Sequence, residues 1–288
     1  MLKLISLLIL FTQLNFAQSK LLTLFDDAGF DNAETTLYAD GQTISSTHAT
    51  LIDDFVSMVK DSFSISSLNE IADVIYLAAN ETSALGLRNL AQRYFDATIG
   101  AATVTFTQWQ GFLGDAVSGY INTNYVPSTD ATAYTLDNAS FGVYVRNIRA
   151  ANSAKYAIGC ARGDGSGYAI IALERSANLP RYYINCTGIG GGTITNTSGF
   201  SLVVRTASNV TKLYKNGIVA NSDTDVSTVL PDVAFTLLAA NTGGSIGAFD
   251  DVQIAFVFIG KGLDATEARK LKNCVEWYMD QLGTGVLP

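Results

Sequence analysis

In one-letter code, residues 199–219 read GFSLVVRTASNVTKLYKNGIV. Two runs in this stretch, 199–207 and 210–216, are rich in the β-branched, apolar and aromatic residues that favour strands. The dipeptide Asn216-Gly217 follows at the end of the second run. Asn-Gly suits a two-residue hairpin turn because both central positions of that turn need a positive φ. The stretch therefore predicts neighbouring antiparallel strands.

The same pattern of short apolar runs separated by turn residues begins at about residue 101. A second hairpin loop is expected at 163–167 (GDGSG), whose glycines permit positive φ. No helical pattern separates the runs, so a βαβ parallel sheet is excluded and an antiparallel sandwich with Greek-key or jelly-roll connections is favoured. The expected strands are 102–108, 117–122, 139–146, 154–161, 167–174, 181–187, 199–207, 210–216, 233–239 and 249–259.

Helical periodicity precedes the β region. Thr47 can cap a helix whose apolar residues recur at helical spacing as far as Val59. Ser67 and Glu70 form a capping box for a second expected helix, which would carry Leu68, Ile71 and Ile75. A third short helix is expected around 81–92.

One more helix is expected after the β region. Asp264 and Glu267 form its capping box, and Gly283 ends it. Leu271, Cys274, Val275 and Tyr278 share one face of this helix, which should close the sandwich.

We divide the chain into residues 1–18, a helical segment 19–100, and a β-sandwich 101–288. The first segment has Lys3, an apolar run over 4–11 and a polar end at 15–18, as a secretory signal does. It is shorter than the roughly 20 apolar residues that span a bilayer. It is read either as a cleaved signal peptide or as a retained anchor that contacts a membrane.

Composition limits the classes of function. The chain has 288 residues, of which 48% are hydrophobic and 15% charged, which is a globular composition. The net charge is −8 and the 18 Lys and Arg are scattered along the chain. Nucleic-acid binders concentrate basic side chains, so nucleic acid is not an expected partner.

The three cysteines, Cys160, Cys186 and Cys274, follow no metal or redox motif. If the runs 155–162, 167–174 and 181–187 form a meander, Cys160 and Cys186 lie about 9–10 Å apart, two strand spacings. A disulfide needs Cα atoms within about 7 Å. Buried free thiols are therefore expected, with a disulfide as the alternative.

Several stretches resemble the concanavalin A-like, LamG-like lectin domains of phage structural and tail-associated proteins. These stretches are 75–79 (IYLAA), 110–115 (QGFLGD), 118–128 (SGYINTNYVPS), 138–144 (NASFGVY), 213–217 (LYKNG) and 256–260 (FVFIG). The resemblance implies a mainly β, concanavalin A-like jelly-roll fold and a role in attachment or virion decoration. It supplies no fixed catalytic residues.

Groups for catalysis are scarce. His48 is the single histidine and starts a predicted helix, so no Ser/His/Asp set or zinc cluster can be assembled around it locally. Glycoside hydrolysis needs two carboxylates across one cleft, and no strand carries alternating acids. Glu174 is isolated, and Asp250 and Asp251 are adjacent, so they face opposite ways on a strand. We expect no enzymatic activity and no required cofactor, with calcium at loop aspartates left open.

Sugar binding needs a flat aromatic face for the C–H surface of the ring and planar polar groups for its hydroxyls. In 181–185 (RYYIN) the alternation favours a buried Tyr182, with Arg181, Tyr183 and Asn185 on the opposite face. The candidate ligand-binding residues are Arg181, Tyr183, Asn185, Tyr168 and Arg162, with Trp109 as a further aromatic candidate.

We expect a non-catalytic surface-binding protein, namely a phage or prophage spike, fibre or decoration component, located in a virion or at a cell surface. Its partners would be host-surface glycans or other virion subunits, and it would act as a homo-oligomer such as a trimer. The alternative is a secreted bacterial adhesin or carbohydrate-binding protein. A glycoside hydrolase is supported by fold analogy alone.

Overall fold

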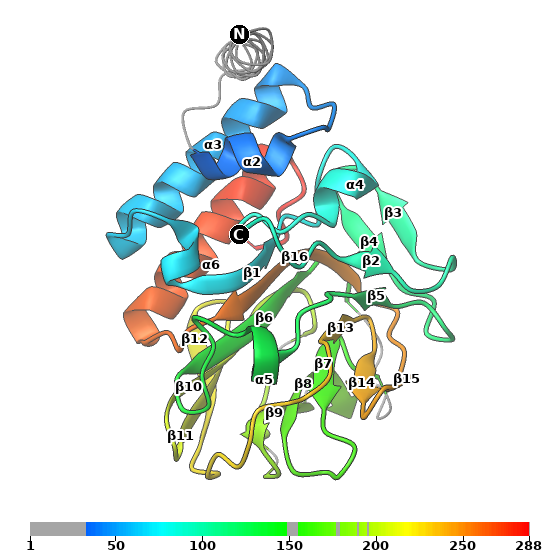
Figure 1. Ribbon diagram of the computed structural model, residues 1–288, viewed down its shortest axis with the longest axis vertical. Coiled ribbons are helices and arrows are strands. Elements are labelled where there is room, and N and C mark those ends of the chain that lie inside the picture. Colours follow the sequence, from blue (N-terminus) through cyan, green and yellow to red (C-terminus); the bar gives the residue numbers. More distant parts are fainter. Residues whose placement is uncertain (1–32, 149–154, 177–178, 189, 195, 288) are drawn as a thin grey trace, which may run out of the picture.

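The computed structural model describes residues 33–148, 155–176, 179–188, 190–194 and 196–287. Two β-sheets face each other, and helices cover the outer side of one of them (Figure 1). The prediction of a mainly β, concanavalin A-like sandwich with a C-terminal helix is confirmed. The helices are α2 (Ala33–Ala39), α3 (Ser46–Phe63), α4 (Ser83–Gly86), α5 (Pro127–Asp130) and α6 (Ala265–Gln281), with a 3-10 turn η1 (Leu68–Glu70).

The first sheet has the order β12-β11-β10-β6-β16-β4-β3, and β1 also pairs with β16. All of its pairings are antiparallel. Asn216 and Gly217, with φ of 53° and 78°, form the predicted turn between β11 and β12. The strands are β1 (Ala72–Tyr76), β3 (Thr105–Thr107), β4 (Gly111–Leu113), β6 (Ala139–Val145), β10 (Gly199–Ala207), β11 (Val210–Lys215), β12 (Ile218–Asp223) and β16 (Gln253–Gly260).

The second sheet contains the predicted meander β7-β8-β9, and β13 and β14 both pair with the other edge of β7. The pairing of β14 with β7 is parallel, and the others are antiparallel. The strands are β2 (Thr98–Ile99), β5 (Ile121–Asn122), β7 (Ile158–Ala161), β8 (Tyr168–Ser176), β9 (Leu179–Cys186), β13 (Thr236–Leu237), β14 (Ala240–Thr242) and β15 (Ser245–Gly247).

Strand β16 lies at the centre of the molecule and is buried on both faces. Val257 and Ile259 point into the core between the sheets, whereas Phe256 and Phe258 point into a second core beneath the helices. Side chains alternate across a strand, so a strand that is apolar at every position needs a layer on each side. The helices supply the second layer.

Helices α3 and α6 cover the first sheet with one apolar face each. Phe55 of α3 contacts Phe256 of β16 and Tyr278 of α6, with ring centroids 6.1 and 5.5 Å apart. The predicted Asp264–Glu267 capping box of α6 is present. Helix α3 begins earlier than predicted, because Ser45 caps it by accepting a hydrogen bond from the backbone N–H of His48.

The prediction of a second helix beginning after Ser67 is wrong. Its Ser67–Glu70 capping box exists, but it caps the 3-10 turn η1, and the chain then continues as strand β1. Ile71 and Ile75 are buried under the helices, while Val74 and Tyr76 enter the core between the sheets. A run that is apolar on every side fits a doubly buried strand as well as a helix. Of the third helix, expected around 81–92, only the four residues of α4 are helical. Helix α2 was not predicted.

The three cysteines are buried and unpaired, as predicted. Cys160 pairs in register with Ala169 and Cys186 with Tyr168, so β8 separates their strands. Residues 1–18, read as a signal or anchor, lie outside the described residues. Across the described ranges, no helix combines the length and apolarity needed to cross a bilayer.

A buried carboxylate connects β1 to the segment after α5. Asp73 is fully buried and accepts five hydrogen bonds. The donors are the backbone N–H groups of Thr132, Ala133 and Tyr134 and the hydroxyls of Thr132 and Tyr125. Loss of this carboxylate would leave buried donors such as the Tyr134 N–H without an acceptor, so Asp73 determines the path of the chain here.

Asp73→Asn should reduce the free energy of unfolding by about 3 kcal/mol or more, because an amide NH₂ would meet N–H donors that need an acceptor. Urea unfolding followed by circular dichroism measures the change. Asp61→Asn removes an exposed carboxylate from α3 and should stay within about 0.5 kcal/mol. Equal effects of the two substitutions would contradict the role assigned to Asp73.

The burial of Lys215 should make the stability of the protein depend on pH. Burial lowers the pKa of Lys215 to about 7, and its ammonium donates to the Thr197 carbonyl and the Ser201 hydroxyl, each at 3.1 Å. An unfolded lysine titrates near pH 10. Between these values the unfolded chain binds more protons, so stability should rise with pH by up to about 1.4 kcal/mol per unit. Lys215→Met should lack this rise, and parallel pH profiles of the two proteins would refute the assignment.

Candidate functional site

The segment 87–96, which we call the 87–96 loop, is built around one buried amide. Asn89 is 4% exposed, and its Oδ1 accepts hydrogen bonds from the backbone N–H groups of Ile75 and Ala91 at 2.9 and 3.1 Å. Its Nδ2 donates to the carbonyls of Asp73 and Tyr94, both at 2.8 Å. One side chain thus joins the loop to β1 and to itself.

The 87–96 loop also covers the outer edge of β1. The Ile75 carbonyl accepts a hydrogen bond from the Leu90 N–H at 2.8 Å, and the Gln92 amide donates to the Asp73 carbonyl at 2.8 Å. The Asp96 carboxylate accepts the Asn89 N–H at 2.9 Å. An uncovered strand edge would leave these backbone groups unpaired. The loop is therefore fixed by the needs of the sheet.

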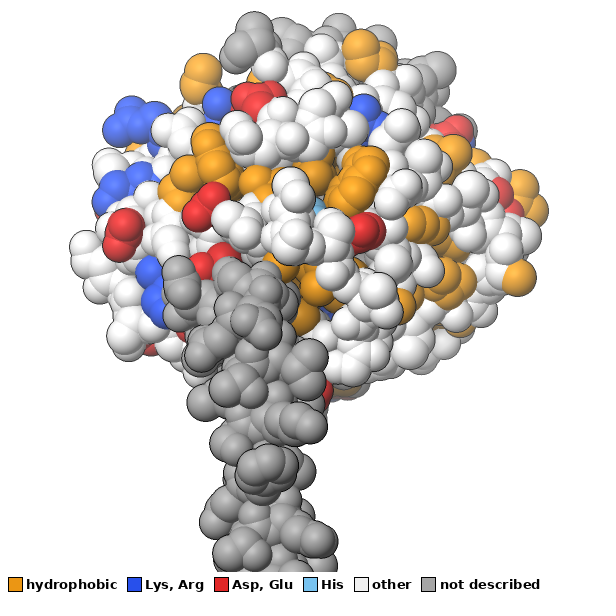
Figure 2. Space-filling view, turned by 90° about the horizontal axis from the view of Figure 1, so that it is seen from above, with side chains coloured by type: hydrophobic (Ala, Val, Ile, Leu, Met, Phe, Trp, Pro, Cys, Tyr) orange, Lys and Arg blue, Asp and Glu red, His pale blue; other side chains and the backbone are white. Residues whose placement is uncertain are grey.

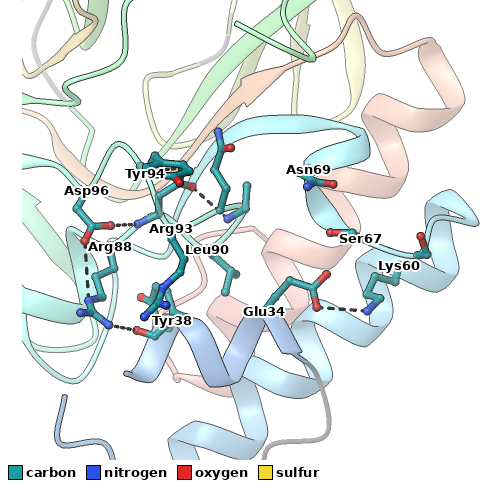
Figure 3. Close-up of a pocket in the computed structure, with 14 residues that line it drawn as sticks. Glu34, Tyr38, Lys60, Ser67, Asn69, Arg88, Leu90, Arg93, Tyr94 and Asp96 are labelled. Atoms are coloured by element: carbon teal, nitrogen blue, oxygen red, sulfur yellow. Dashed lines mark hydrogen bonds and ion pairs between the residues drawn. The ribbon is translucent and has the colours of Figure 1, made fainter. Parts of the chain in front are cut away.

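This rigid loop holds Tyr94 away from the core. The Tyr94 side chain is 71% exposed, although most large aromatic residues in the described ranges are buried. The next residue, Phe95, has φ of 67°, a region that costs energy for a bulky residue, and its ring packs on Tyr125 at 5.3 Å. One turn thus directs Phe95 toward the core and Tyr94 toward solvent, and Figure 3 shows Tyr94 among the residues that line a cavity.

The cavity has a volume of about 470 Å³, within the usual range of ligand pockets. It lies between the 87–96 loop, α2, the C-terminal end of α3 and the 66–69 turn (Figure 3). We call it the Tyr94 pocket. The lining residues are Glu34, Tyr38, Lys60, Ser66, Ser67, Asn69, Arg88, Asn89, Leu90, Ala91, Gln92, Arg93, Tyr94 and Asp96.

The charges around the Tyr94 pocket are arranged in pairs. Lys60 pairs with Glu34 at 3.3 Å, Arg88 with Asp96 at 4.0 Å, and Arg93 with Asp40 beside the pocket. At the floor, the Tyr38 hydroxyl donates to the Leu85 carbonyl, and burial raises the pKa of this hydroxyl, so it remains protonated. The pocket offers many hydrogen-bonding groups with little net charge.

No protein-family model and no curated protein sequence matches this chain. Solved structures share its fold. The botulinum neurotoxin serotype D binding domain matches with a TM-score of 0.52 and 14% identity over 71% of this chain and 52% of the toxin chain. Botulinum neurotoxin type C, whose cell entry depends on interaction with two ganglioside molecules, matches with a TM-score of 0.50 and 15% identity, over 72% and 51%.

The fold shared with these structures is a β-sandwich. A Trypanosoma rangeli sialidase also matches, with a TM-score of 0.46 and 16% identity over 83% of this chain and 40% of the sialidase chain. The chain spans about half the length of the toxin structures. At this level of identity the likeness concerns the fold.

The site predicted from the sequence lies on the second sheet. The rings of Tyr168 and Tyr183 meet there, with centroids 5.1 Å apart, and both are partly exposed. Arg181 lies beside Tyr183, and Tyr182 is buried as predicted. Arg162 instead pairs with two acids, Asp164 at 3.3 Å and Asp232 at 3.2 Å. Ligand binding by these residues stays a prediction.

The expected position of Asn185 on the exposed face is wrong. Asn185 is fully buried. Its Oδ1 accepts a hydrogen bond from the Tyr134 hydroxyl, and its Nδ2 donates to the carbonyls of Thr135 and Leu136. Its φ is 54°, and it is the extra residue of a bulge between β8 and β9. A bulge breaks the alternation from which the position was predicted.

Calcium binding stays a prediction. Within the described ranges, no three His, Cys, Asp or Glu side chains form a group that could hold a metal ion. The loop acid Asp164 accepts hydrogen bonds from Ser166, and Asp137 accepts one from Ser227. These acids have the turn-stabilising contacts that loop aspartates commonly make.

The Tyr94 pocket was not found from the sequence. The stretch 92–96 (QRYFD) places two aromatic residues between charged ones, which is a weak local signal. This signal was not used because the preceding residues, 81–92, were expected to form a helix. That Tyr94 faces solvent while Phe95 faces the core depends on the positive φ of Phe95, which no pattern of residue types reveals.

Asn89→Ala should reduce the free energy of unfolding by about 2–4 kcal/mol, since backbone groups of β1 and of the loop would lose their partners. Tyr94→Ala, a larger truncation at an exposed site, should stay within about 0.5 kcal/mol. Urea unfolding of both variants measures the contrast. A destabilising Tyr94→Ala would show that the ring serves the fold and would remove the reason to assign it to a ligand.

Proposed function

We propose that this chain is a non-catalytic glycan-binding protein and that the Tyr94 pocket is its saccharide site. The observation that carries the proposal is the 71% exposure of Tyr94 on a loop whose backbone is fixed from within. Tyr94 is the one exposed aromatic side chain among the described residues, and it lines a cavity rich in polar groups, which is the combination expected of a ligand site.

The chemistry of the pocket suits a sugar. The flat face of Tyr94 can cover the C–H surface of a pyranose ring, and its hydroxyl can remain hydrated. The amides of Asn69 and Gln92 and the guanidinium of Arg93 provide planar polar groups for ring hydroxyls. The paired charges add donors and acceptors without a strong net field, as a polyhydroxylated ligand requires.

Preorganisation supports the same proposal. Weak sugar contacts are easily cancelled by the entropy lost when a loop becomes ordered on binding. The 87–96 loop has lost that entropy on folding, because Asn89 and the β1 edge already fix it. The shared fold of the neurotoxin binding domains agrees with this role by analogy.

A binding role also suits the acids of the pocket. Glycoside hydrolysis needs one carboxylic acid that is protonated and can donate to the leaving oxygen. Glu34 is paired with Lys60 and Asp96 with Arg88, and Asp96 also accepts the Asn89 N–H, so both carboxylates already have structural partners. We therefore assign the pocket to recognition of an intact saccharide.

The setting of this activity is part of the proposal. The sequence resemblance to phage structural and tail-associated proteins favours attachment to host-surface glycans from a virion, as an oligomer. A secreted bacterial adhesin is the alternative. Mass spectrometry of purified particles distinguishes the two, since a virion component would be present at a fixed copy number.

Binding of the full chain to a panel of neutral and acidic oligosaccharides, measured by calorimetry, tests the function. Tyr94→Ala should weaken binding of any saccharide that binds by at least about tenfold, the loss expected for a stacking contact. The matched control Tyr183→Ala, on the second sheet, should change it by less than about twofold.

The reverse pattern would move the saccharide site to Tyr168 and Tyr183. Absence of saturable binding by the whole panel at millimolar concentrations would refute the glycan-binding function.

A further inference from the structure

A second hollow lies between α3 and α6, at the end of the molecule that the helices form. Its volume is about 640 Å³. Figure 2, which looks onto this end, shows hydrophobic side chains gathered among polar ones. We call it the tryptophan pocket. Its lining residues are Ser45, Thr47, His48, Thr50, Leu51, Asp54, Trp109, Trp277, Gln281 and Leu282.

The pocket brings together rare residues from distant parts of the chain. Trp109 and Trp277 are the two tryptophans of the sequence, and His48 is its single histidine. Both indoles are partly exposed at the pocket. Two large aromatic surfaces left open to solvent in one concavity are typical of a binding site.

Trp109 is held in position by the polypeptide around it. Its backbone N–H donates to the Asn80 carbonyl at 2.9 Å, and its ring meets His48 edge to face, with centroids 4.7 Å apart. Its φ is 63°, a region that an aromatic residue adopts only when its surroundings impose it. The indole is therefore preorganised at the pocket.

Hydrogen bonds also fix the state of His48. The Asn80 Nδ2 donates to the Tyr38 hydroxyl and the Leu77 carbonyl, so its Oδ1 must be the partner of His48 Nε2 at 2.9 Å. Nε2 then carries the proton of a neutral imidazole. Burial lowers the pKa of His48, so the ring adds no positive charge to the pocket at neutral pH.

The remaining charge in the pocket is negative. Asp54 is exposed at its edge, and no Lys or Arg is present among the lining residues in the part of the chain that the structure describes. No described side chain forms an ion pair with Asp54. The whole chain carries a net charge of −8, which strengthens the attraction for a cation.

We propose that the tryptophan pocket binds a small quaternary ammonium compound of the choline type. Indole faces attract cations most strongly among the aromatic side chains, and Asp54 adds a countercharge. A quaternary ammonium group has no N–H donors, so it enters an aromatic pocket with little loss of hydrogen bonding to water. This site is separate from the Tyr94 pocket and does not depend on the proposed glycan function.

Intrinsic fluorescence tests the proposal selectively. Both tryptophans line this pocket and none lines the Tyr94 pocket, so indole emission reports on the tryptophan pocket. The full chain is titrated with choline chloride to about 50 mM, a range that covers millimolar affinity. Potassium chloride controls for ionic strength, and 3,3-dimethyl-1-butanol is the neutral isostere of choline.

Choline should cause a saturable change in emission, and the neutral isostere should bind at least about fivefold more weakly. Asp54→Asn should weaken choline binding about fivefold, whereas Asp61→Asn, which removes an exposed acid from the same helix outside the pocket, should not change it. Trp277→Leu should abolish the response. Asp54→Asn alters one exposed atom, so it keeps the test valid if Trp277→Leu does not fold.

Three results would overturn the proposal. These are no saturable change with choline, equal binding of the neutral isostere, and a response to methyl hexosides without a response to choline. The last result would make the pocket a saccharide site. Loss of glycan binding in Tyr94→Ala, with the choline response retained, would leave both assignments standing and independent.

Discussion

The burial of β16 on both faces is the constraint on which the structure depends. A strand that is apolar at successive positions cannot face water, so the first sheet needs the second sheet on one side and helices on the other. The helices α3 and α6 follow from this need. Their junction creates the tryptophan pocket, and β1, paired along β16, creates an edge that must be covered.

The Tyr94 pocket is a consequence of covering that edge. The Ile75 backbone points away from β16, and the 87–96 loop satisfies it through Asn89 and Leu90. The same hydrogen bonds that protect the sheet hold Tyr94 in solvent. Stability of the sheet and presentation of an aromatic ring are therefore achieved by one loop.

Two kinds of concave surface result, and their chemistry differs. The Tyr94 pocket combines one exposed ring with paired charges and amides, whereas the tryptophan pocket combines two indoles with a single acid. Both lie at the helix-covered sheet. Tyr168, Arg181 and Tyr183, selected from the sequence, lie on the second sheet, whereas Trp109, also selected, lines the tryptophan pocket. The strand alternation that predicted a buried Tyr182 and an outward Tyr183 agrees with the structure, but it failed at Asn185, where a bulge inserts one residue.

The sequence by itself determined the features that depend on neighbours along the chain. The Asn216-Gly217 turn, the long strand runs such as 139–146 and 199–207, and the Asp264 capping box follow from local propensity and period. The separation of Cys160 from Cys186 followed on the condition that their runs form a meander, which they do. Only the tertiary structure decided that 72–76 is a strand, that Tyr94 faces solvent, and that His48, Trp109 and Trp277 converge. These depend on long-range burial and on positive φ angles, and neither is encoded in the periodicity of a single segment.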